Sequence, residues 1–200
     1  MPSPNSQRRP RSSILNLPGL GSFIEISSDY ASEGSADYFE RIAPIRCWLR
    51  TLGWPIVLSA LLAAIPYPCG CTPISLKIDA KAYDVALSLI PSLLGFGIGA
   101  YALVFGLSGE LLRKIQIGHN EIYAERGSSA GSVLSINSAF AFPLVTMVVT
   151  TIVASIHKVL PDLQLLSTAT WFLTFLCLTL TYQLVASLYK LGRVIILDKF

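Results

Sequence analysis

Charged residues are scarce in this sequence. Lys, Arg, Asp and Glu together make up 14% of the 200 residues, whereas they make up about 25% of an average soluble protein. Apolar residues make up 52%. This composition excludes an ordinary soluble domain and indicates a membrane protein. The net charge of +3 is also too small to indicate direct nucleic-acid binding.

Motifs that carry chemistry are also missing. The sequence contains no P-loop, no HExxH, no GxSxG and no GxGxxG placed after a strand. Its two histidines, His119 and His157, stand alone, and no histidine or further cysteine accompanies Cys69 and Cys71. A metal site needs more ligands close together. We therefore expect no catalytic residue, no metal and no cofactor.

Four long uncharged runs are what the sequence has instead. A helix needs about 20 residues to cross the hydrocarbon core of a bilayer. The first run follows a long polar segment, whereas a secretory signal has its apolar stretch within roughly the first 15–30 residues, so we interpret this run as a retained span. The sequence predicts an all-α membrane protein whose four-helix transmembrane domain covers residues 51–200, with spans at about 52–70, 85–108, 138–157 and 166–189.

The distribution of basic residues predicts the orientation of the spans. With both termini on one side, that side carries twelve of the basic residues, namely Arg8, Arg9, Arg11, Arg41, Arg46, Arg50, Arg113, Lys114, Arg126, Lys190, Arg193 and Lys199. The other side carries three, namely Lys77, Lys81 and Lys158. Basic residues favour the cytoplasmic side. We expect a multi-pass membrane protein with N-in/C-in topology, whose termini and whose loop between the second and third spans are cytoplasmic.

Two segments precede the predicted transmembrane domain. Residues 1–34 are rich in Ser, Pro, Gly and Arg, which predicts a disordered cytoplasmic tail. The pattern of residues 35–50 predicts an interfacial helix that begins at Ser35, bends at Pro44 and leads into the first span.

The second predicted span contains the stretch SLLGFGIGAYALVFGLSGE, with five glycines. Small residues recur there at alternating steps of four and three, which places them on one helix face. We name this set the small-residue seam: Ser88, Ser92, Gly95, Gly99, Ala102, Gly106 and Gly109. Because lipid gives helices no hydrophobic reason to associate, they pack through close backbone contact, which small residues permit. The seam predicts helix packing within or between subunits; the alternative is a pore-lining or gating face.

The fourth span carries a second stripe, made of Ser167, Thr170, Thr174, Cys177 and Thr181. The third span carries Thr146, Thr150, Ala154 and His157 at related spacing. Hydroxyls in membrane helices bond to the carbonyl four residues earlier or across one helix interface, and the alternative is a weakly polar conduit where these faces converge. No carboxylate, Lys or Arg lies at mid-membrane depth, which argues against a proton relay, an ion-coupled transporter or a voltage sensor.

The segment IPSLLGFGIGAYALVFGLSGELLRKI, residues 90–115, resembles the membrane subunits of bacterial anti-phage defence systems, and among them the Kiwa type. The resemblance covers this segment, the small four-span architecture and the basic inner loops, but not the polar tail. It implies an inner-membrane homo-oligomer that responds to phage attack and a cytosolic, DNA-binding partner on the inner side. No functional residue follows from it.

A partner has one obvious place to dock. The outer loops are short, the spans have no ionisable groups and the tail is expected to be disordered, so the loop between the second and third spans is left as the main surface, helped by residues 36–50. Its candidate docking residues are Arg113, Lys114, Glu121, Glu125 and Arg126. The alternative is that these charges only anchor the inner side in lipid.

Two function classes remain open from the sequence. The first is a non-enzymatic sensor or scaffold that is surrounded by membrane lipid, forms a homo-oligomer through the second span and recruits a cytosolic protein. The second is a pore or channel that perturbs ion or small-solute permeability. A membrane enzyme is the least favoured class, because acid, base and metal-binding residues are missing from the spans.

Overall fold

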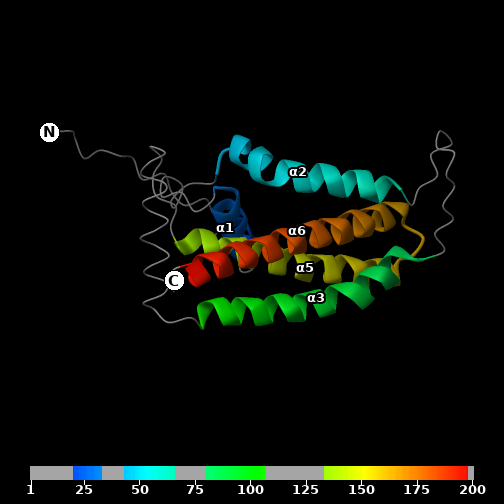
Figure 1. The fold of residues 1–200 in the computed structure, drawn as a ribbon. Helices are drawn as coiled ribbons and strands as arrows, with labels where there is room; N and C mark the ends of the chain where they lie inside the picture. The colour runs from blue at the N-terminus through cyan, green and yellow to red at the C-terminus, as the bar shows by residue number, and fades with distance from the viewer. Residues whose placement is uncertain (1–19, 33–42, 66–79, 107–132, 198–200) are drawn as a thin grey trace.

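The computed structural model describes residues 20–32, 43–65, 80–106 and 133–197 (Figure 1). In these ranges the chain forms the helices α1 (Leu20–Ala31), α2 (Ile45–Ala64), α3 (Ala82–Phe105), α5 (Val133–Val159) and α6 (Gln164–Leu197). Four stretches are long and apolar enough to cross a membrane, namely Ile45–Ala64, Ala82–Phe105, Asn137–Val159 and Gln164–Tyr189. The prediction of an all-α protein with four membrane spans is confirmed.

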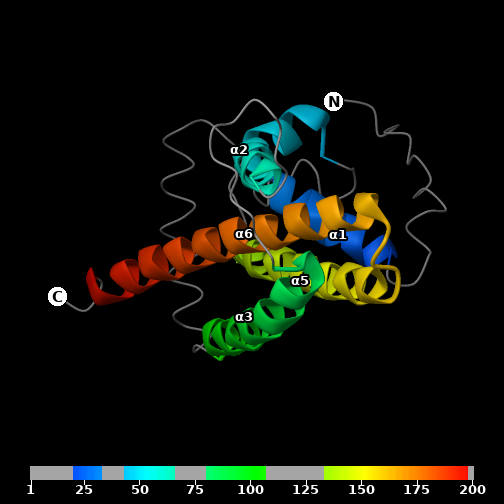
Figure 2. The ribbon, with the colours of Figure 1, turned by 90° about the vertical axis from the view of Figure 1, so that its right-hand side faces the viewer.

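The four long helices run in alternating directions (Figure 1). α3 packs on α5 and α6, α5 packs on α6, and α2 packs on α6 and on α1. α2 and α3 lie at opposite edges of the bundle in both views (Figures 1 and 2). We call the end that carries Arg46, Arg50 and Arg193 the arginine end, and the end that carries Lys81 and Lys158 the lysine end. The N-in/C-in orientation in a membrane stays a prediction.

The first span begins earlier than the sequence predicted. α2 starts at Ile45, and Pro44 precedes it in an extended conformation with φ −65° and ψ 151°. Proline disfavours continuation of a helix through it, because its ring clashes with the preceding turn and it has no N–H. Pro44 therefore separates α2 from what precedes it instead of bending one helix, and residues 45–50, predicted to be interfacial, are the first turns of α2. The rest of the predicted interfacial helix lies outside the described residues.

The predicted disordered tail is wrong over Leu20–Ala31, which forms α1. The apolar side chains of this short helix, Ile26 and Tyr30, pack with Leu52, Phe142 and other residues of α2, α5 and α6. The segment was predicted to be disordered because residues 1–34 are rich in Ser, Pro, Gly and Arg and show little periodicity. In the structure Ser27 and Ser28 are buried, and Ser27 donates to the carbonyl of Phe23.

Directional contacts attach α1 to the bundle at the arginine end. The Tyr30 hydroxyl donates to Gln183 Oε1 of α6 over 2.7 Å, and the Tyr30 ring stacks on Phe142 of α5 with centroids 4.5 Å apart. The backbone N–H of Ala43 donates to Ser28 Oγ over 2.9 Å, and Thr51 Oγ1 donates to the carbonyl of Ala31 over 3.2 Å. α1 is thus bonded to the segment that leads into α2 as well as to α2 and α6.

Asp29 gives the attachment of α1 a pH dependence. Partial burial, and to a lesser degree the negative charge of Glu25, raise the pKa of Asp29 above its ordinary value of 3.8. The folded state therefore binds this proton more tightly than the unfolded state does. Stability is gained as the pH falls through the raised pKa toward 3.8, and it is lost as the pH rises through the same window.

We predict that Asp29→Asn raises the thermal unfolding midpoint at neutral pH, because the amide cannot ionise. The gain over wild type should shrink as the pH approaches 3.8, where the wild-type carboxyl is protonated too. Melting curves of the full chain in detergent, recorded across this range, measure the effect. Asp162→Asn, in the exposed turn between α5 and α6, is the control. A gain that does not depend on pH would contradict the prediction.

Candidate functional site

The small-residue seam lies on the outside of the bundle. α3 buries Ala82, Tyr83, Ala86, Ile90, Gly97 and Val104. All the described seam residues, Ser88, Ser92, Gly95, Gly99, Ala102 and Gly106, are exposed, and Gly109 lies outside the described residues. The seam therefore packs against no described helix of its own chain, so packing within the subunit is not its role among these residues.

Glycines in the same stretch serve two different faces. A Cβ added at Gly95 or Gly99 would meet no other atom within 4 Å, whereas one at Gly97 would lie 2.5 Å from Leu144 Cδ2 of α5. Gly97 is therefore the glycine that brings α3 close to α5. The seam pattern left it out, because a step of two residues from Gly95 moves nearly to the opposite side of a helix. The only sign of this contact in the sequence was that Gly97 lies off the face of the seam.

We predict different responses to alanine at the two faces. Gly97→Ala should lower the stability of the single chain by about 1 kcal/mol relative to Gly99→Ala, because Leu144 must move to accommodate the added methyl group. Gly99→Ala should leave the unfolding of the single chain unchanged. Unfolding of the monomer in detergent, followed by circular dichroism, checks this. Equal effects at the two positions would mean that the packing of α3 on α5 is wrong.

The threonine hydroxyls of α5 and α6 donate hydrogen bonds to backbone carbonyls of their own helices. Thr170, Thr174 and Thr181 each donate to the carbonyl four residues earlier over 2.7 Å. Thr146 and Thr150 of α5 do the same over 2.8 Å. This confirms the prediction of local bonding, which removes the cost of placing hydroxyls in an apolar interior.

The two hydroxyl-bearing faces also meet each other. Thr150 Oγ1 lies 3.1 Å from Cys177 Sγ, and His157 Nδ1 lies 3.1 Å from Thr170 Oγ1. Fully buried side chains, among them Ile90, Met147 and Ala154, pack around these pairs. These contacts cross one helix interface, as the first interpretation expected, and the described side chains form a packed core there.

At the lysine end, polar and aromatic side chains from neighbouring helices contact one another. His157 is only 3% exposed, and its ring meets the Tyr83 ring edge-on with centroids 5.1 Å apart. Lys158 Nζ lies 3.9 Å from Asp84 Oδ1, and both side chains are exposed. An exposed pair of this kind contributes little to stability. The contacts of His157 join α3, α5 and α6.

The described residues show no arrangement that could hold a metal ion: no three His, Cys, Asp or Glu side chains gather in them. The predictions that the chain has no cofactor and is not an enzyme stay predictions. Cys69 and Cys71, and all the candidate docking residues (Arg113, Lys114, Glu121, Glu125 and Arg126), lie outside the described residues.

Comparison with known proteins adds no relative: no family model, no curated protein and no solved structure matches the chain. Function therefore has to be inferred from the exposed seam, the packed interior and the charged ends of the bundle.

Proposed function

We propose that this chain is a non-enzymatic sensor or scaffold subunit of a bacterial inner membrane, and that it serves in an anti-phage defence system. It forms a homo-oligomer through the small-residue seam of α3, and it recruits a cytosolic protein. The observation that carries this proposal is the outward position of the seam, where Gly95 and Gly99 have room for a neighbour.

The physics of helix association supports a second copy as that neighbour. Lipid tails solvate leucine as well as another helix does, so exposed apolar bulk gives no reason to associate, whereas a smooth face lets two backbones approach closely. The described seam extends from Ser88 to Gly106, which is about 27 Å of helix at 1.5 Å per residue. That length nearly matches the hydrocarbon core of a bilayer, about 30 Å. Close contact along the seam can thus extend through most of the membrane.

We predict that Gly99→Leu separates the oligomer and leaves the subunit folded. The leucine meets nothing in its own chain within 4 Å of the added Cβ, but it blocks close approach by a neighbouring α3. Native gels and mass photometry of the purified protein measure the oligomer, and circular dichroism measures the helix content. Ala60→Leu, at an exposed position of α2, is the matched control. Equal oligomer in both variants would reject the seam as the contact.

The pore remains the alternative function, and the exposed hydroxyls of the seam favour it. Ser88 and Ser92 are exposed near the lysine end of α3, and in a ring of subunits the same face could line a central axis. Ion release from vesicles that hold the reconstituted chain separates the two functions. Release that Gly99→Leu changes supports the pore, whereas tight vesicles with intact oligomers support the scaffold.

Recruitment of the cytosolic partner is assigned to the loop that follows α3. Residues 107–132 connect α3 to α5 along the chain, so a tilt of α3 within an oligomer would act directly on the loop that carries Arg113 and Lys114. A ligand or partner shifts such an equilibrium only by binding one state better than the other. α6 adds surface at the arginine end, where residues 190–197 continue it about 12 Å beyond its membrane span (Figure 1).

We predict that reversing the loop charges with Arg113→Glu and Lys114→Glu abolishes phage protection, while insertion and oligomer size stay unchanged. Plaque counts on a strain that carries the chain with its neighbouring genes measure protection. Lys158→Gln, a charge change at the lysine end, is the control. Full protection by the loop variant would exclude this loop as the partner's contact surface.

A further inference from the structure

One face of α2 carries an ordered row of exposed side chains. Along the helix the row reads Arg46, Arg50, Trp54, Val57, Leu61 and Ile65, in steps of four, four, three, four and four. Such steps keep the residues within one side of a helix. All six are exposed, because α2 turns its opposite side, with Leu52, Pro55, Ser59 and Ala63, into the bundle. We name this set the α2 row.

The residue types along the α2 row match the parts of a phospholipid, from its charged headgroup to its acyl chains. It begins with two cations at the arginine end, continues with an aromatic ring and finishes with aliphatic side chains. Trp54 is 70% exposed and lies about 12 Å further along the helix than Arg46 at 1.5 Å per residue, so its ring is at the depth of the acyl chains. The distance along the helix from Arg46 to Val57 is about 16 Å on the same rise. One leaflet of the hydrocarbon core has about the same thickness, roughly 15 Å.

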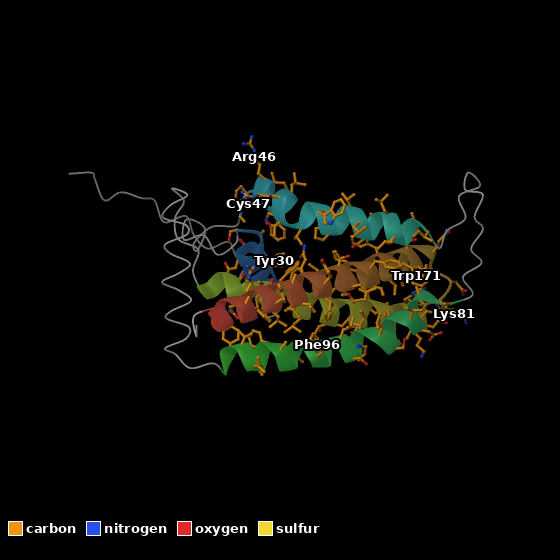
Figure 3. All side chains as sticks on the ribbon, viewed as in Figure 1. Tyr30, Arg46, Cys47, Lys81, Phe96 and Trp171 are labelled. Atoms are coloured by element: carbon orange, nitrogen blue, oxygen red, sulfur yellow. The ribbon has the colours of Figure 1, made fainter. Side chains whose placement is uncertain are left out.

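The two arginines have no partner of their own among the described residues. α2 has no acidic residue in its first turn, and within the described ranges no ion pair joins Arg46 or Arg50 to a carboxylate. Figure 3 shows Arg46 pointing away from the bundle. Guanidinium groups bind phosphate oxygens through two parallel N–H donors. Two of them one turn apart, beside an apolar column, fit an anionic headgroup that is attached to a tail.

We propose that the α2 row binds an anionic phospholipid of the leaflet at the arginine end. The phosphate lies between Arg46 and Arg50, and an acyl chain follows Trp54, Val57 and Leu61. A net negative lipid is preferred over a zwitterionic one, because the ammonium group of the latter offsets its phosphate charge. A soluble acidic protein would reach the arginines but not the aliphatic part of the row, and this favours a lipid. The proposal does not depend on the proposed function.

Tryptophan fluorescence of the full chain in vesicles tests the proposal. Of the three tryptophans, Trp54 is exposed, Trp48 is partly buried with its Nε1–H bonded to the carbonyl of Ala43, and Trp171 is 8% exposed. Phosphatidylglycerol or phosphatidylcholine with brominated acyl chains is added to a phosphatidylcholine bilayer. Quenching that disappears in Trp54→Phe belongs to Trp54.

We expect brominated phosphatidylglycerol to quench Trp54 with an apparent association constant roughly fivefold higher than that of brominated phosphatidylcholine, as expected for cations beside an anionic lipid. In the double variant Arg46→Gln/Arg50→Gln the ratio should fall to about one, with quenching by phosphatidylcholine retained as evidence of insertion. Arg193→Gln, at the same end of the bundle, should keep the wild-type ratio. In the wild type, high salt should lower the ratio through screening.

Three results would overturn the proposal. Equal quenching by the two lipids in the wild type would show that the row does not select anionic lipid. A preference that survives in the double variant would place the lipid elsewhere. Quenching by neither lipid would show that a protein, such as a second copy of the chain, covers Trp54. The salt measurement needs no variant, so a double variant that fails to fold still leaves the proposal open to refutation.

Discussion

Close packing between helices is the interaction on which this fold depends. Water drives soluble helices together through their apolar sides, but in lipid the apolar side chains are solvated on every face, so shape decides which helices meet. Gly97 shows this inside the subunit, where the missing side chain admits Leu144 of α5. Hydroxyls help in the same way, since Thr150 and Thr170 satisfy their own helix carbonyls and remain compact enough to touch Cys177 and His157 across the interface.

The attachment of α1 depends on a different kind of contact. Ordered hydrogen bonds hold α1 in place through Tyr30, Ser28 and Ala31, together with the stacking of Tyr30 on Phe142. Such bonds contribute about 1 kcal/mol each where water competes, so several are needed to attach a helix of 12 residues. The arginine end is therefore held by many weak directional contacts and the spans by close packing.

Hydropathy alone predicted the four spans, because a helix that crosses lipid must be apolar over about 20 residues whatever its neighbours are. It could not predict which face of each span is buried, since interior and lipid-facing residues are equally apolar. The spacing of small residues grouped Gly95 and Gly99 correctly on one face, but gave no sign that this face points outward and that Gly97 makes the intrachain contact. α1 was missed for a different reason: residues 1–34 were interpreted as one polar segment from their overall composition, and the hydrogen bonds of Tyr30 and Ser28 that help to hold α1 leave no mark in a hydropathy pattern.

The α2 row and the small-residue seam could both be occupied at once, because they lie on helices that the bundle keeps apart. α2 packs on α6 and α1, α3 packs on α5 and α6, and the two helices lie at opposite edges (Figure 1). A neighbouring subunit at the seam would thus leave the α2 row open to lipid. Arg46 and Arg50 lie in the first turns of α2, close to Thr51, whose hydroxyl donates to the carbonyl of Ala31 in α1. Occupation of the α2 row would therefore bear on the attachment of α1 and, through Tyr30 and Gln183, on α6. A lipid on the α2 row and a second subunit at the seam would thus contact different helices, and α6, which both α2 and α3 contact, is the element through which the two could be coupled.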